Sequence, residues 1–317
     1  MSKLDRYLEA ATRDNTRRSY ASAVRHFEIE WGGHLPATPD SVANYLAAYA
    51  GRLAINTLKQ RLAALAQWHT EQGFVDPTSM PLVRKVLKGV QAVHPQMEKQ
   101  AEPLQILQLT QISQWLTGAM TDQEITPARA LMYRRDHALV LLGFWRGFRT
   151  DELMRLRVEH IRLVANKGMT CFLPRTKGDR QNQGNTFTVP ALSRLCPVTA
   201  VREWISAAAL TEGPVFRSVG RWGQIGQRSL HPNSFVPLLR RLFTDAALST
   251  PEVYSGHSLR RGFAGWANDN GWDVKTLMEY VGWKDMRSAL RYIDSDDPFH
   301  MLLVKETKAQ PLSLAAG

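Results

Sequence analysis

The chain has 317 residues, 44% of them hydrophobic, and its 40 Lys and Arg against 29 Asp and Glu give a formal net charge of +11 at pH 7. This size predicts two domains that fold without disulfides, and the excess of positive charge makes nucleic acid the leading class of partner, although a merely basic soluble protein would show the same balance. Cys171 and Cys196 lie outside any CxxC or Cys/His cluster, the first 20 residues lack a signal-peptide core, and no stretch approaches 18 uninterrupted apolar residues; we therefore expect a cytoplasmic protein without a zinc site or a membrane span.

The N-terminal third has the periodicity of helices. From residue 16 to about residue 93 apolar residues recur three or four positions apart, as in Tyr20, Val24 and Phe27. Starting and stopping signals divide this stretch into four short helices, among them the Pro-Asp-Ser string at 39–41 and Gly73. We therefore predict an all-α N-terminal domain at residues 1–97. The following segment is rich in proline and charge, which is typical of a linker, and we place that linker at residues 98–104.

The remaining chain, residues 105–317, is expected to form a larger domain that is mainly helical with a small antiparallel sheet. The helical period recurs at 109–116, 134–145 and 150–156, and again at 233–247, 258–270, 274–281 and 286–293. Between them the period changes to that of short strands, at 161–164, 169–173 and 186–189. Residues 218–226 are rich in glycine and are expected to form turns, and residues 298–308 are expected to form one more amphipathic helix.

Four short motifs in this domain contain side chains suited to phosphate chemistry. Cleaving a DNA phosphodiester without a metal requires a nucleophile, cations that offset the charge on the phosphate oxygens, and an acid for the leaving 5′ oxygen. The motifs are GFRTDEL with Arg149 and Glu152, RTKGD with Lys177, SGHSLRRG with His257 and Arg260, and VGWKDMRSALRYID with Trp283 and Tyr292. Singly, each has an ordinary structural explanation: a helix ion pair, a solvated turn lysine, a chance H-x-x-R string, or a core aromatic residue.

Taken together and in this order, the motifs resemble the tyrosine recombinase (phage integrase) family, most closely its Cre-like members. The resemblance extends over the helical N-terminal domain and the linker, and so covers nearly the whole chain. It implies an N-terminal core-binding domain of the SAM-like type and a C-terminal catalytic domain, which together form a C-shaped clamp on DNA.

The resemblance also implies roles for the motif residues. Tyr292 would be the nucleophile and form a 3′-phosphotyrosine, while Arg149 and Arg260 would bind the non-bridging phosphate oxygens, a task that suits a planar, permanently charged guanidinium. Lys177 would protonate the leaving 5′ oxygen and His257 would share the acid–base work. A further residue, Glu152, would orient the arginines.

Trp283 departs from the commoner family pattern, in which a histidine follows the glycine. An indole donates one hydrogen bond but cannot accept or shuttle a proton. Trp283 would therefore hold a phosphate oxygen and pack against the tyrosine helix, or serve simply as a core tryptophan. Because a phosphotyrosine conserves the energy of the phosphodiester, the resemblance implies no metal, no ATP and no other cofactor.

The expected partner is double-stranded DNA with an inverted-repeat target site, bound by a homodimer at each site and by a homotetramer when two sites synapse, with an accessory DNA-binding protein as an open question. Helices at 15–27 and 56–68 would enter the major groove, and one helix of the larger domain would contribute two arginines. The candidate DNA-binding residues are Thr16, Arg18, Asn56, Lys59, Gln60, Arg240 and Arg241. Alternatively, these polar and charged residues simply lie on helix faces that are exposed to solvent and do not contact DNA.

Three other functions share these features. A type IB topoisomerase uses the same chemistry to relax DNA, although the compact helical N-terminal domain favours recombination. A telomere resolvase would act on single sites. An architectural DNA-binding protein would keep the fold without catalysis, and would have no use for an aligned Tyr292, Lys177 and His257.

Overall fold

The computed structural model describes residues 3, 6–7, 12, 14–96, 100–164, 167–176, 179, 183–286 and 289–290. Lys177 and Tyr292 lie outside these residues, as do the expected helix at 298–308 and most of the one at 286–293. The chain divides into two compact units, Met1–Lys99 and Gln100–Gly317. No helix in the part of the chain that the structure describes is long and apolar enough to cross a membrane.

The described residues of the N-terminal unit form a bundle of four principal helices: α2 (Asp14–Arg25), α3 (Pro39–Ala48), α4 (Ile55–Glu71) and α5 (Pro81–Val93). A π-helical turn, His26–Glu30, follows α2. The start of α3 is fixed because Thr38 Oγ1 accepts a hydrogen bond from Ser41 N at 3.2 Å and proline occupies the first helical position. Helix α2 packs against α4 and α3 against α5, which confirms the predicted four-helix pattern.

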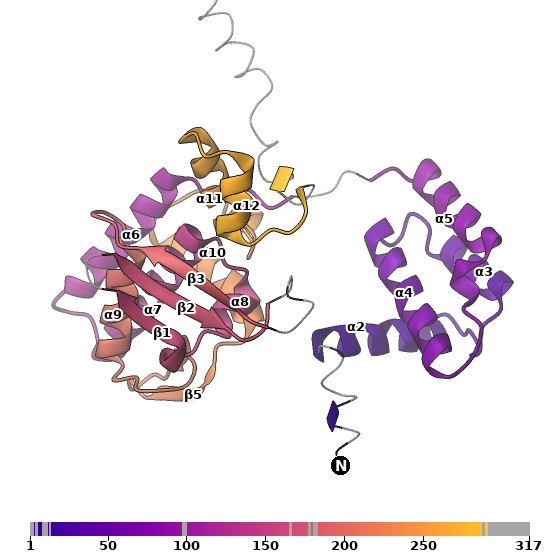
Figure 1. The fold of residues 1–317 in the computed structure, drawn as a ribbon, viewed down its shortest axis with the longest axis horizontal. Helices are drawn as coiled ribbons and strands as arrows, with labels where there is room; N and C mark the ends of the chain where they lie inside the picture. The colour runs from indigo at the N-terminus through magenta and orange to yellow at the C-terminus, as the bar shows by residue number, and fades with distance from the viewer. Residues whose placement is uncertain are drawn as a thin grey trace, which may run out of the picture. The chain divides into compact units, whose positions relative to one another are not determined.

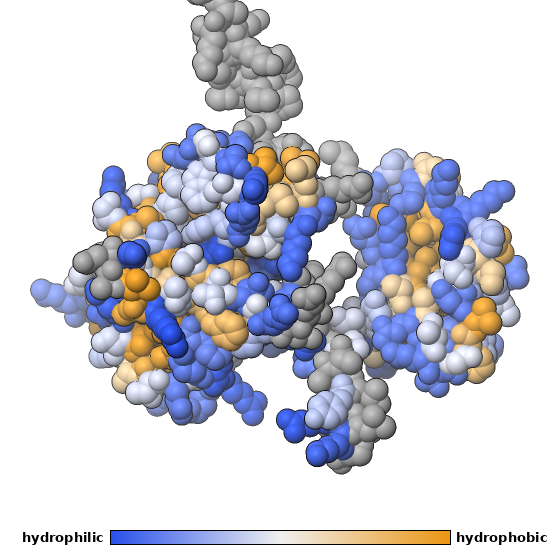
Figure 2. Space-filling model, in the orientation of Figure 1, coloured by the Kyte–Doolittle hydropathy of each residue, from blue (hydrophilic) through white to orange (hydrophobic). Residues whose placement is uncertain are grey.

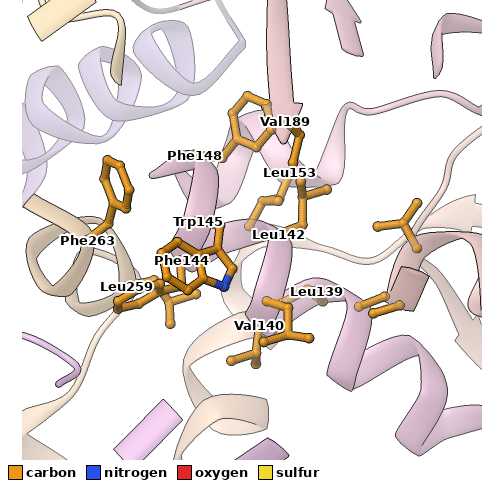
Figure 3. Close-up of a cluster of buried hydrophobic side chains, with 14 of the residues drawn as sticks. Leu139, Val140, Leu142, Phe144, Trp145, Phe148, Leu153, Val189, Leu259 and Phe263 are labelled. Carbon is orange, nitrogen blue, oxygen red and sulfur yellow. The ribbon is translucent and has the colours of Figure 1, made fainter. Parts of the chain in front are cut away.

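The helices of the second unit surround one long buried helix, α7 (Pro127–Arg146). The surrounding helices are α6 (Ile106–Thr121), α8 (Thr150–Met154), α9 (Pro197–Ala207), α10 (Phe235–Asp245), α11 (Ser258–Asp269) and α12 (Val274–Val281). The second half of α7 is buried on every side, and Figure 3 shows its residues Leu139, Leu142 and Phe144 in a cluster with Leu259 and Phe263 of α11. Helix α7 ends at Arg146, and the chain turns at the following residue, Gly147, whose φ of +60° favours glycine.

Three antiparallel strands form a sheet in the order β1 (Ile161–Val164), β2 (Gly168–Leu173) and β3 (Asn185–Pro190). The sheet crosses the second unit below α11 and α12 in the view of Figure 1. Alternate residues of β2, Met169, Cys171 and Leu173, are buried in the core, and Cys171 is opposite both Ile161 and Phe187. The predicted fold class, mainly α with a small antiparallel sheet, is confirmed.

Two elements correct the sequence analysis. Residues 218–226, expected to form turns, take part in a second hairpin of β4 (Arg217–Val219) and β5 (Ile225–Ser229). Helix α9 was not predicted. Its first turn is capped by a thiol, since Cys196 Sγ accepts from Thr199 N at 3.4 Å, and the sequence therefore lacks the usual Ser, Thr, Asp or Asn signal.

A pair of glycines on α11 gives a test of how closely the chain from residue 100 to residue 105 packs on this helix. A Cβ atom at Gly262 would overlap the carbonyl oxygen of Leu104, whereas a Cβ at Gly265 would meet nothing within 4 Å. We expect Gly262→Ala to lower the free energy of unfolding by about 2–3 kcal/mol through overpacking, and Gly265→Ala to raise it by up to about 1 kcal/mol through helix propensity. Urea denaturation of both variants measures this, and equal effects would contradict the packing.

Candidate active site

Arg149 stands at the start of α8 and is held by a carboxylate of the same turn. Glu152 Oε2 accepts a hydrogen bond from Arg149 N at 2.8 Å, and Oε1 accepts one from Arg149 Nη1 at 2.8 Å. The Glu152 side chain is 4% exposed and that of Arg149 is 27% exposed. Glu152 thus fixes both the backbone and the guanidinium of Arg149, while part of that guanidinium stays accessible to an anion.

Arg260 lies in the first turn of α11 and joins the ends of two other helices. Its Nη1 donates to the carbonyl oxygen of Gly147 at 2.5 Å, and its Nη2 donates to that of Val281 at 3.3 Å. Gly147 follows α7 and Val281 is the last residue of α12. With only 1% of its surface exposed, Arg260 is held in one orientation. Gly147, which accepts one of its hydrogen bonds, lies two residues before Arg149 in the sequence.

The turn before α11 brings His257 to the same region. Ser258 Oγ accepts from Ser255 N at 2.9 Å, which closes the turn. A Cβ atom at Gly256 would overlap Thr150 Oγ1, so this turn lies directly against the start of α8. His257 follows Gly256 and is exposed. The structure therefore gathers Arg149, Arg260 and His257 around the starts of α8 and α11.

Trp283 lies against Arg260. The chain leaves α12 through Gly282, whose φ is +75°, and the Trp283 indole is then 6% exposed with its ring centroid 4.8 Å from Arg260 Cζ. This stacking supports the guanidinium on the face of an aromatic ring. The expected contact between Trp283 and a phosphate oxygen stays a prediction.

Lys177 and Tyr292 are placed only by their position in the chain. Lys177 belongs to the connection between β2, which ends at Leu173, and β3, which begins at Asn185. Tyr292 follows α12 and the turn with Trp283. Their side chains lie outside the described residues, so their roles stay predictions.

The candidate DNA-binding residues of the N-terminal unit occupy two helices that pack together. Arg18, Asn56 and Lys59 are exposed and Thr16 is partly exposed. Gln60 Nε2 donates to Ser19 Oγ at 2.8 Å and thereby links α4 to α2. Figure 2 shows hydrophilic side chains over much of both units.

The two candidate arginines of α10 differ in their surroundings. Arg240 is exposed and its Nη2 donates to the carbonyl oxygen of Glu252 at 2.7 Å. Arg241 instead forms an ion pair with Asp136, which is fully buried in α7. Arg241 therefore anchors α10 to α7, and Arg240 is the more exposed of the two. The DNA contacts of both residues stay predictions.

One charged residue beside this site was missed by the sequence analysis. Arg146, the last residue of α7, is 5% exposed, and its guanidinium carbon lies 4.2 Å from the centre of the Tyr280 ring and 4.7 Å from that of Phe187. Burial lowers the pKa of Arg146 to about 10. The sequence signal is a charge at the end of the apolar run ALVLLGFW, directly before the motif GFRTDEL.

Comparison with known proteins places the chain in a family. Residues 114–298 match the phage integrase family. The chain is 28% identical over 307 residues to the "Integrase/recombinase xerD homolog" of Selenomonas ruminantium, covering 94% of this chain and 86% of that protein. It is 24% identical over 298 residues to "Recombinase cre" of Escherichia phage P1, covering 88% and 82% respectively.

Solved structures show the same fold. The XerH site-specific recombinase bound to a palindromic difH substrate is 14% identical with a TM-score of 0.62, over 92% of this chain and 79% of that chain. The Tn1549 transposon integrase in complex with transposon right-end DNA is also 14% identical, with a TM-score of 0.61, over 94% of each chain. With the family match over more than half its length, the chain belongs to the phage integrase family of tyrosine site-specific recombinases.

Proposed function

We propose that this recombinase cuts and rejoins DNA through a 3′-phosphotyrosine bond to Tyr292 and exchanges strands between two target sites. The observation that carries the proposal is the convergence of Arg149, Arg260 and His257 at the starts of α8 and α11. Attack on a phosphodiester builds negative charge on the non-bridging oxygens, and preorganised cations lower the free energy of that state. The two arginines supply those cations.

The two guanidiniums are preorganised in different ways. Arg260 is oriented by carbonyl oxygens of Gly147 and Val281 and by the Trp283 ring, and Arg149 by Glu152. Because these contacts exist before DNA binds, little reorganisation accompanies the reaction. Each arginine would bind a non-bridging oxygen, and Glu152 would act through Arg149 without touching phosphate.

Proton transfer is assigned to the remaining motif residues. Lys177 would protonate the departing 5′ oxygen, and His257 would take part in acid–base work around the tyrosine hydroxyl. Trp283 can donate a hydrogen bond but cannot relay a proton. The tyrosine ester conserves the energy of the broken phosphodiester, so the free 5′ hydroxyl of the partner strand can attack it and reseal the DNA without ATP.

Double-stranded DNA is the partner that the net charge of +11 and the DNA complexes of XerH and of the Tn1549 integrase support. We propose that both units bind one duplex, the N-terminal unit through α2 and α4. We further propose a dimer on each inverted-repeat site and a tetramer on two synapsed sites. The similarity to recombinases over nearly the full length favours this function over DNA relaxation by a type IB topoisomerase, telomere resolution or an architectural role.

Replacing Tyr292 with phenylalanine should abolish cleavage, because the nucleophilic oxygen is lost, while the affinity for the target site stays within about threefold of the wild-type value. The measurement is covalent trapping on a nicked target site, followed by mapping of the peptide that remains attached to DNA. An adduct in the Tyr292→Phe variant, or a wild-type adduct on another residue, would remove Tyr292 as the nucleophile.

DNA affinity should fall steeply as the salt concentration rises. For each phosphate contact, log K should decrease by about 0.9 for every tenfold increase in salt concentration. Lys59→Ala in α4 should reduce this slope by about one contact. Lys88→Ala, an exposed lysine on α5, should leave it unchanged. Fluorescence anisotropy titrations between about 50 and 200 mM salt measure the slopes, and equal slopes for both variants would argue against α4 as a DNA-binding helix.

A further inference from the structure

Arg146 carries a buried charge. It is 5% exposed, and its buried Nε and Nη1 atoms have no hydrogen-bond partner among the residues that the structure describes. Its pKa of about 10 keeps it charged at neutral pH. Among the groups that raise this pKa, Glu152 is the carboxylate, and Glu152 already binds Arg149. The charge of Arg146 is therefore poorly compensated by its surroundings.

Aromatic rings from two elements hold the guanidinium instead. Its carbon lies 4.2 Å from the ring centre of Tyr280 in α12 and 4.7 Å from that of Phe187 in β3, with Phe148 at 5.8 Å. Trp145, which precedes Arg146, also contacts Tyr280: its carbonyl oxygen accepts a hydrogen bond from Tyr280 Oη at 2.9 Å. Two consecutive residues at the end of α7 thus bind one side chain of α12.

The same end of α12 holds Arg260. Val281, next to Tyr280, accepts a hydrogen bond from Arg260 Nη2 at 3.3 Å, and the Trp283 ring stacks on the Arg260 guanidinium. Gly282, between these two residues, borders the Phe187 ring, because a Cβ there would lie 3.6 Å from Phe187 Cε1. The rings that enclose Arg146 therefore adjoin the turn that grips Arg260.

Stability alone does not favour an arginine at this place. Moving a charge out of water costs free energy that aromatic faces recover only in part, and an apolar side chain of similar volume is often neutral or stabilising where a buried charge is replaced. A residue that opposes stability beside a catalytic arginine is typical of a functional constraint.

We propose that Arg146 is a positioning residue for Arg260: by stacking between Tyr280 and Phe187 it fixes the end of α12, so that Val281 and Trp283 hold Arg260 in its phosphate-binding orientation. This inference rests on the proposed function, in which Arg260 binds the scissile phosphate. Arg146 itself acts through the α12 turn.

The first test replaces Arg146 with methionine, which keeps a long unbranched side chain and removes the charge. We expect the melting temperature to stay unchanged or to rise, DNA affinity to stay within about threefold, and single-turnover cleavage at saturating DNA to slow by about tenfold or more. Arg146→Lys, which restores a cation between the rings, should recover part of the rate. Wild-type cleavage, or a melting temperature lower by several degrees, would overturn the proposal.

A second measurement separates positioning from a general structural role. If Arg146 acts through Arg260, then adding Arg146→Met to Arg260→Ala should slow cleavage by no more than about twofold beyond Arg260→Ala alone. Multiplicative losses in the double variant would show that Arg146 acts independently, which would overturn the proposal.

Arg135 on the same helix provides the matched control. It is also 5% exposed, but its Nε and Nη2 donate to Asp136 Oδ1 at 2.8 and 2.6 Å. Arg135→Met should lower the melting temperature, because it removes a partner of a buried carboxylate, and leave cleavage by the folded protein unchanged. Failure of the underlying function is distinguishable: wild-type cleavage by Arg260→Ala would refute the role of Arg260 itself.

Discussion

The arrangement of the active-site segments depends on one interaction, the pair of hydrogen bonds that the Arg260 guanidinium donates to two backbone carbonyl groups. The guanidinium donates to the carbonyl oxygens of Gly147 and Val281, which end two helices far apart in the sequence. Carbonyls at helix ends lack partners within their helices and carry the negative end of the helix dipole, so a buried cation between them satisfies both groups and is itself stabilised. The segments with Arg149 and Trp283 leave from these two helix ends, and their positions follow from this contact.

The sequence analysis located those residues because their chemistry is local. Arg149 and Glu152 are three positions apart at the start of α8, so the backbone geometry of one turn brings their side chains together. His257 and Arg260 have the same spacing at the start of α11. The strands were predictable because the helical period gives way to short apolar segments separated by turn residues; β1 spans Ile161–Val164, the range predicted. Helix α12 likewise begins at an aspartate cap, Asp273, and ends at Gly282.

Other features depend on contacts between distant segments and leave little trace in the sequence. The roles of Arg241 and Arg146 follow from Asp136 in the first case and from Tyr280 and Phe187 in the second. Neither could be read from spacing, because the partners are brought together by packing. The β4–β5 hairpin was hidden for a similar reason: its strands are short and mostly polar, so pairing rather than propensity makes them strands.

The close packing of Leu104 on α11 has a mechanical consequence. The stretch after Lys99 is bound to this helix at several points: Leu104 N donates to the carbonyl oxygen of Ser258 at 2.9 Å, its own carbonyl lies over Gly262, and Gln100 accepts from Arg261. Residues 100–104 are therefore part of the packed body of the second unit and move together with α11, the helix that carries Arg260.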